Sequence, residues 1–209
     1  MKTVTDIKPQ KRGKDRANIF LDGTFAFSVS QEVLEHSCIT PGQTLTDSQI
    51  ADLTTDDSIV KCREAALRLL NYRPRSEAEI RTRLSRRFDR EAVDSVISQL
   101  MARQMIDDLT FATFWKENRE SCNPRSQRLL RLELSKKGVS QEVIAEVLEG
   151  IDEEESAYRA AKKKERSLQR EDYDSFRRKL GSSLRRRGFS YEVIKRTVER
   201  IWRESYNSP

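Results

Sequence analysis

The stretch KKGVSQEVIAEVLEGI, residues 136–151, decides the fold because the chain repeats its pattern. Residues 186–201 read RRGFSYEVIKRTVERI, and residues 88–100 read FDREAVDSVISQL. The related segments begin at residues 88, 139 and 189, so their starts are separated by 51 and 50 residues. Self-similarity at a fixed period of this length is the signature of a repeat architecture. We therefore predict three tandem copies of one structural unit.

Each copy has the features of a helix start. A candidate N-cap side chain can accept hydrogen bonds from the first free backbone N–H groups, and a glutamate two residues later faces the positive end of the helix dipole. The candidate caps are Asp89, Ser140 and Ser190. An apolar residue before each cap can pack onto the helix as a hydrophobic staple. The predicted staple pairs are Phe88 with Val93, Val139 with Ile144, and Phe189 with Ile194.

Glycine precedes two of the three copies. Gly138 and Gly188 are natural left-handed stops for the helix before each phrase. The first copy has no such glycine, so its turn is one residue shorter.

Two further helices are predicted upstream of each phrase, from apolar residues at i, i+4 spacing. First helices are expected at 61–73, 107–121 and 153–169, and middle helices at 76–87, 123–137 and 173–187. Ser76 and Glu79 form a capping box for one middle helix, and Asn123 is expected to cap the next, with Pro124 at its first position. The predicted repeats span residues 58–106, 107–151 and 152–209.

The first 57 residues have a different pattern. Asp22-Gly23 lies between runs rich in β-branched and aromatic residues, which is a strong hairpin signal because both turn residues need positive φ. Residues 2–10 supply a possible third strand, and short helices are expected after Ser30 and around residues 46–53. The predicted fold is mainly α: an elongated tandem array of three three-helix repeats behind a small β-rich N-terminal domain, residues 1–57.

Composition places few demands on function. The net charge is +6 and the pI is near 9.3, a mild basicity that permits an acidic or polyanionic partner. Net charge is −3 in residues 1–57, +5 in 58–106, −1 in 107–151 and +5 in 152–209. Three dispersed cysteines, no apolar run of membrane-spanning length and no secretion signal favour a cytoplasmic protein without a membrane partner. We expect a monomer.

No constellation for catalysis is visible. His36 is the one histidine, and no glycine-rich phosphate-binding loop or zinc-ligand spacing occurs. The acidic run 152–155 is best explained as the start of a helix, where carboxylates complement the dipole. We predict no enzyme activity and no cofactor or metal.

Basic residues gather near the ends of the middle helices, and they are the candidate binding residues. One interpretation is that they satisfy helix dipoles and keep the protein soluble; the other is that successive repeats form a shared basic surface for an extended partner. The third helices lack the Asn, Gln and Arg expected for base readout, so sequence-specific DNA binding is disfavoured. The candidates are Arg73, Arg75, Arg81, Arg83, Arg86, Arg87, Lys136, Lys137, Arg185, Arg186 and Arg187.

Four stretches in this order resemble the RecX family of regulatory proteins: ALRLLNYRPRSEAEIRTRLSRR, VISQLMARQMIDDLTFATFW, ELSKKGVSQEVI and LRRRGFSYEVI. The likeness covers residues 62 to about 203. It implies a non-enzymatic protein that binds the filament of the RecA recombinase on single-stranded DNA and inhibits its ATPase and strand exchange. The family offers no short motif of functional residues, so the candidate list is an electrostatic inference. The alternative hypothesis is a helical repeat module that binds nucleic acid directly and independently of sequence.

Overall fold

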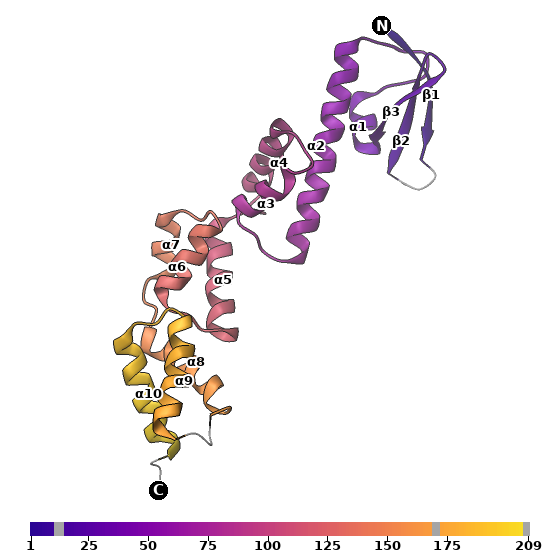
Figure 1. Cartoon of the computed structure of the whole chain (residues 1–209). Coiled ribbons are helices and arrows are strands. Elements are labelled where there is room, and N and C mark those ends of the chain that lie inside the picture. The colour runs from indigo at the N-terminus through magenta and orange to yellow at the C-terminus, as the bar shows by residue number, and fades with distance from the viewer. Residues whose placement is uncertain (11–14, 169–171, 207–209) are drawn as a thin grey trace. The chain divides into compact units, whose positions relative to one another are not determined.

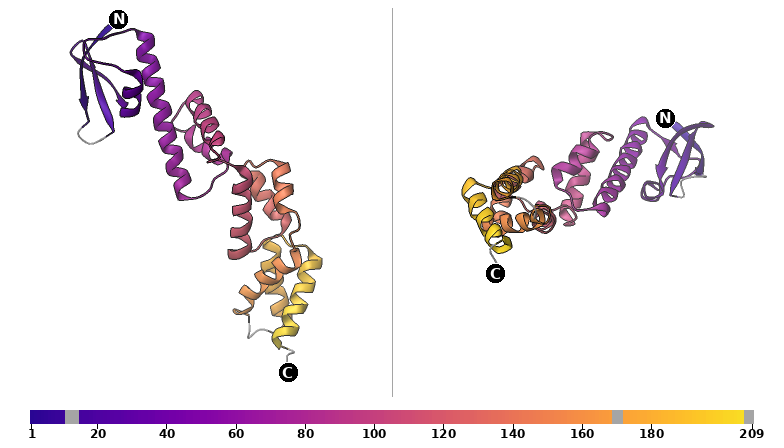
Figure 2. Two further views of the ribbon diagram at one scale, coloured as in Figure 1. Left: turned by 180° about the vertical axis from the view of Figure 1, so that it is seen from behind. Right: turned by 60° about the horizontal axis from the view of Figure 1, so that its bottom comes forward.

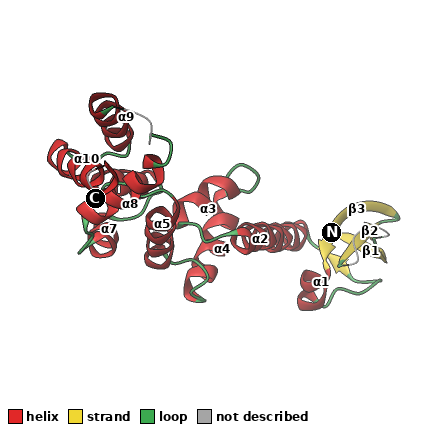
Figure 3. Ribbon diagram, turned by 90° about the horizontal axis from the view of Figure 1, so that it is seen from below, coloured by secondary structure: helices red, strands yellow, loops and turns green. Residues whose placement is uncertain are grey.

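A computed structural model describes residues 1–10, 15–168 and 172–206. These residues form ten helices and four strands, and the prediction of a mainly α chain with a β-rich N-terminal part is confirmed (Figure 3). The chain divides into two compact units. Unit 1 contains residues 1–73 and 80–106, and unit 2 contains residues 74–79 and 107–209.

Unit 1 begins with a four-stranded antiparallel sheet in the order β3-β2-β1-β4. Its strands are β1 (Lys2–Pro9), β2 (Arg16–Leu21), β3 (Thr24–Ser30) and the short β4 (Thr44–Leu45), with α1 (Gln31–Ser37) after β3. The predicted hairpin is confirmed, because Asp22 and Gly23 both have positive φ, 49° and 80°. Ser30 caps α1 by accepting a hydrogen bond from the Val33 N–H.

The long helix α2 (Asp47–Tyr72) joins this sheet to the first repeat. It replaces two helices that were expected separately, around residues 46–53 and at 61–73. Thr46 and Gln49 close a capping box at its start. Leu53 and Val60 belong to the core under the sheet, whereas Cys62 and Ala66 belong to the core of the first repeat. One helix therefore serves two hydrophobic cores.

Asp57 lies at the boundary that was expected between residues 57 and 58, where α2 continues without a turn. Its side chain is almost fully buried and forms an ion pair with Arg16 on β2, at 2.8 Å. It also accepts from the Ser30 N–H at 2.7 Å and pairs with Lys61 at 2.7 Å. A polar residue in mid-helix thus anchors α2 to two strands.

The same contacts make the stability of unit 1 depend on pH. Burial favours the neutral carboxyl, but Arg16, Lys61 and the Ser30 N–H outweigh it and hold the pKa of Asp57 below its ordinary value. A carboxyl with a lowered folded-state pKa contributes stability above its unfolded pKa of about 4, and that contribution disappears as pH falls through the folded value. Asp57→Asn should lower the free energy of unfolding at pH 7 by about 2 kcal/mol, because Arg16 loses its counter-charge.

Denaturant titrations at neutral and acidic pH will check this expectation. The difference between the wild type and Asp57→Asn should shrink as pH falls below about 4. Asp56→Asn is the matched control, since Asp56 is the exposed neighbour. Equal effects of the two substitutions at pH 7 would contradict the anchor.

The repeats follow as groups of helices, as predicted (Figure 1 and Figure 2). The first repeat has α3 (Glu77–Leu84) and α4 (Arg90–Ala102) after α2, and the first residues of α3 belong to unit 2. The second has α5 (Asp108–Cys122), α6 (Gln127–Lys136) and α7 (Gln141–Leu148). The third has α8 (Glu153–Glu165), α9 (Tyr173–Arg186) and α10 (Tyr191–Tyr206). We keep 58–106, 107–151 and 152–209 as the proposed boundaries; Gln169 and residues 207–209 lie outside the described residues.

The predicted helix starts of the repeated phrase are confirmed. Asp89, Ser140 and Ser190 accept hydrogen bonds from backbone N–H groups three residues on, at 2.8, 3.4 and 3.3 Å. Gly138 and Gly188 have φ of 81° and 87°. The staple residues of the second and third copies are buried in the cores of their repeats. Asp152 likewise caps α8, as the acidic run suggested.

One predicted cap was wrong. Ser126, and not Asn123, caps α6, accepting from the Leu129 N–H at 3.2 Å. Asn123 instead ends α5, and the buried Pro124 lies in the connection between the helices. The middle helix of the second repeat therefore starts later than its proline suggested.

Candidate functional site

The predicted basic residues occupy two kinds of environment. Six of them are exposed: Arg83, Arg86, Arg87, Lys136, Arg185 and Arg186. The other five are partly or fully buried: Arg73, Arg75, Arg81, Lys137 and Arg187. Only the first group presents its charge fully to a partner.

Arg86, Lys136 and Arg186 stand at the same position of the three repeats, two residues after Leu84, Leu134 and Leu184. Within the part of the chain that the structure describes, none of these three cations has an ion pair. Their charges are therefore available for phosphate or carboxylate groups. This recurrence is the structural basis for treating them as candidate binding residues.

Three of these five residues, Arg75, Lys137 and Arg187, lie at a junction that recurs in unit 2. A Pro-Arg-Ser sequence stands before α3 (residues 74–76) and again before α6 (residues 124–126). The Ser76 hydroxyl donates to the Lys137 carbonyl at 2.6 Å, and the Ser126 N–H donates to the Arg187 carbonyl at 3.0 Å. In each case the start of one middle helix meets the end of the next repeat's middle helix.

The two stop glycines are required at this junction. A Cβ atom built at Gly138 would lie 2.3 Å from the Ala78 Cβ, and one at Gly188 would lie 2.5 Å from the Ser126 Oγ. Both distances are far below van der Waals contact. The glycines therefore allow a close approach between successive repeats, in addition to adopting positive φ.

Ion pairs and burial engage the other basic groups. Lys137 pairs with Glu79 at 2.6 Å, and its ammonium lies 5.1 Å from the centre of the Trp115 ring. Arg75 is 6% exposed. Burial and the neighbouring Arg186 lower the pKa of the half-buried Arg187 guanidinium. The Lys137 charge is engaged at the junction, and burial keeps Arg75 and Arg187 from presenting their charges fully, so the binding proposal depends on the exposed group.

Arg81 in unit 1 is also engaged, because it pairs with Asp94 across α3 and α4. Asp94 forms a second ion pair with Arg90, at 3.4 Å. Together the two arginines hold the pKa of the Asp94 carboxyl below its ordinary value. The Asp94 carboxylate therefore neutralises part of the positive charge of these two arginines.

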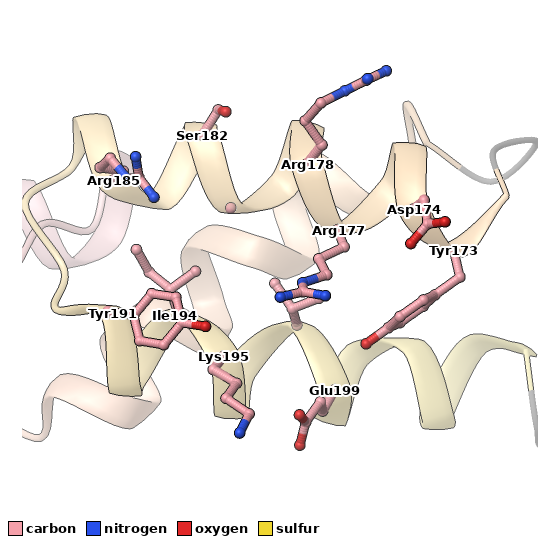
Figure 4. Close-up of a pocket in the computed structure, with 12 residues that line it drawn as sticks. Tyr173, Asp174, Arg177, Arg178, Ser182, Arg185, Tyr191, Ile194, Lys195 and Glu199 are labelled. Carbon is pink, nitrogen blue, oxygen red and sulfur yellow. The ribbon is translucent and has the colours of Figure 1, made fainter.

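A groove between α9 and α10 gives the third repeat a different surface. Its cavity volume is about 500 Å³. Figure 4 shows Arg177 reaching from α9 toward α10, with Tyr173 near one end of the groove and Tyr191 near the other. The basic residues that line it are Arg177, Arg178, Arg185 and Lys195. Asp174 and Glu199 are its acidic residues, and Glu199 is also 3.7 Å from Arg203.

Sequence reasoning found Arg185 but missed the rest of this groove. The available signal was helical spacing: Arg177 and Arg185 are eight residues apart on α9, and Tyr191 and Lys195 are four apart on α10. That signal does not show that the two faces meet. The packing of α9 against α10 is visible only in the three-dimensional structure.

Among the described residues, no histidine or cysteine lines this groove. His36 is exposed, and its Nδ1 lies 2.8 Å from the Glu32 carbonyl oxygen. Cys38, Cys62 and Cys122 are free thiols, and burial raises the pKa of Cys62 to about 11. Among the described residues, no group of His, Cys, Asp and Glu is arranged to hold a metal ion. None of the described helices is both long and apolar enough to cross a membrane.

Comparison with known proteins now gives these repeats a family. Four family models match in order along the chain: the regulatory protein RecX N-terminal domain at residues 2–46, and its first, second and third three-helix domains at 62–100, 107–148 and 152–198. A regulatory protein RecX from Clostridium botulinum strain Alaska E43 is 33% identical over 95% of this chain and 96% of its own length. The chain belongs to the RecX family.

Other RecX proteins agree with this assignment. The one from Clostridioides difficile strain 630 is 26% identical over 96% of each chain. A crystal structure of regulatory protein RecX superposes with a TM-score of 0.70 at 28% identity, covering 95% of this chain and all of the other. The resemblance noted in the sequence is thereby confirmed, and these relatives are regulatory proteins by name.

Proposed function

We propose that this RecX-family chain binds the filament that the RecA recombinase forms on single-stranded DNA and inhibits its ATPase and strand exchange. The observation that carries the proposal is the ordered match to all four RecX domain models across residues 2–198. The relatives are named regulatory proteins, which agrees with a modulating role. The chain acts by occupying the filament and not by chemistry, in the cytoplasm where the filament assembles.

The exposed cations support this proposal physically. Arg86, Lys136 and Arg186 repeat once in each three-helix unit and have no ion pair within the described residues. A filament is also a repeated structure, so several weak contacts can form at once and add up to a high overall affinity. Cations that meet phosphates release condensed counterions, which makes such binding weaken as salt rises.

A titration of recombinase ATPase activity tests the proposal directly. The recombinase is assembled on single-stranded DNA, and this chain is added from substoichiometric to excess amounts. We expect ATP hydrolysis to fall as the chain is added, and strand exchange to fall in parallel. Full ATPase activity at excess protein, under conditions in which the chain binds free DNA, would refute the filament proposal.

The alternative, direct binding of nucleic acid without sequence preference, is supported by a separate observation. The groove between α9 and α10 combines exposed cations with exposed tyrosines, which is the combination that proteins use to bind single strands. The two functions are compatible, because a filament contains both recombinase and DNA.

A further inference from the structure

The groove of the third repeat has an excess of positive charge among the residues that the structure describes. Arg177, Arg178, Arg185 and Lys195 are all exposed, and within the described residues none of them forms an ion pair. Asp174 and Glu199 leave a net charge of +2 among its ionised side chains. A groove of this sign attracts an anionic ligand along its length.

The corresponding faces of the other repeats lack this charge. At the position of Lys195 the first repeat has Asp94 and the second has Ala145. At the position of Arg177 they have Glu77 and Gln127. The basic groove is therefore a property of the third repeat and not of the repeat pattern.

A glycine leaves the groove open. Gly181 stands where the other middle helices have Arg81 and Arg131, and Arg81 extends to Asp94 across the first repeat. A Cβ atom at Gly181 would be 3.6 Å from the Ile194 Cγ2, which places this position on the face that meets α10. The missing side chain gives a ligand access to the space between the helices.

Two tyrosines give the groove aromatic surfaces as well as charge. Tyr191, the first residue of α10, is 60% exposed, and Tyr173, the first residue of α9, is 38% exposed. Tyr173 is held by an edge contact with Trp202, at 5.1 Å between ring centres. Exposed rings beside cations suit a ligand that has both unpaired bases and phosphates.

We propose that the groove between α9 and α10 binds single-stranded nucleic acid, with Arg177, Arg185 and Lys195 contacting phosphates and Tyr191 and Tyr173 stacking on bases. This inference deepens the proposed function, on which it rests, by naming the component of the filament that the third repeat contacts. A duplex is a poorer ligand because its bases are already stacked. An acidic peptide would use the cations but leave the rings without bases.

Direct binding of a short, fluorescently labelled oligothymidylate, without recombinase, tests the groove. Tyr191→Ala should weaken binding about 5- to 150-fold, the range expected for loss of one base–aromatic stack. The double variant Arg177→Gln, Arg185→Gln should reduce the slope of log K against log salt by about 1.4, because each lost phosphate contact removes about 0.7. The control pair is Arg103→Gln with Arg128→Gln, two exposed cations outside the groove. It should leave the affinity for the oligothymidylate nearly unchanged.

Two further variants at Gly181 separate blocking from misfolding. Gly181→Ala adds a methyl at ordinary contact distance and should fold and bind normally. Gly181→Glu places a carboxylate in the groove and should weaken binding by at least tenfold. Circular dichroism checks that both fold.

Three results would overturn the groove proposal: unchanged binding by Tyr191→Ala and the arginine pair, equal affinity for a duplex of the same sequence, or displacement of the oligonucleotide by polyglutamate as effectively as by unlabelled DNA. The filament proposal fails on a different result, the absence of ATPase inhibition by the wild type. Loss of oligonucleotide binding in the groove variants supports the groove whether or not the wild type inhibits the recombinase.

Discussion

Gly188→Ala should lower the free energy of unfolding of unit 2 by about 3 kcal/mol, whereas Gly150→Ala should lower it by about 1 kcal/mol. Both glycines have positive φ, 87° and 70°. A Cβ atom at Gly188 would meet the Ser126 Oγ at 2.5 Å and the Leu129 Cβ at 3.0 Å, whereas one at Gly150 would have nothing within 4 Å. The difference between the two variants isolates the close approach of successive repeats from backbone strain.

Urea denaturation followed by tryptophan fluorescence measures this difference, since Trp202 packs against the core of the third repeat. A rescue experiment at the other junction strengthens it. Gly138→Ala should be less destabilising when Ala78 is glycine, because the conflicting atom at 2.3 Å is then absent. Equal losses at Gly188 and Gly150, together with no rescue, would show that the junction tolerates a side chain.

Reversing the charge at the recurrent exposed position should strongly weaken binding to the filament. The triple variant Arg86→Glu, Lys136→Glu, Arg186→Glu changes one exposed cation in each repeat, and none of the three has an ion pair among the described residues. Attraction to the phosphates becomes repulsion, so the concentration that half-inhibits the ATPase should rise more than tenfold at low salt. The loss should shrink at high salt, where exposed charges are screened.

The matched control makes the same change in net charge elsewhere. Arg103→Glu, Arg128→Glu and Arg166→Glu again alter one exposed cation in each proposed repeat. If this triple variant inhibits as poorly as the first, net charge and not position controls the interaction. Normal inhibition by the first variant would show that the recurrent cations are not part of the proposed interface.

Local signals predicted the repeats well because each helix start depends on residues close in sequence. The caps Asp89, Ser140 and Ser190 and the stop glycines act within one turn, so a periodic phrase identifies them. The continuity of α2 could not be seen in this way. From the local sequence, Asp57 marks the end of the N-terminal part. Its role inside α2 depends on Arg16, a partner 41 residues earlier in the chain.

The same distinction applies to the candidate site. Charge alone placed Arg75, Lys137 and Arg187 in one group with the exposed cations, but their burial at the junction between repeats separates them from that group. Ser76 and Lys137 are 61 residues apart, a separation that helical periodicity does not encode. The groove was missed for a related reason: its opening depends on a side chain that Gly181 lacks.

The double role of α2 has a consequence for cooperativity. Leu53 and Val60 cover the sheet, while Cys62 and Ala66 fill the first repeat, so loss of either core leaves apolar residues of the same helix in water. The N-terminal sheet and the first repeat should therefore lose and regain their amide protection together, as a single foldon. Within unit 1, the unit that unfolds cooperatively therefore extends across the boundary between the family domains. Removing the N-terminal sheet should disturb the repeat that follows it.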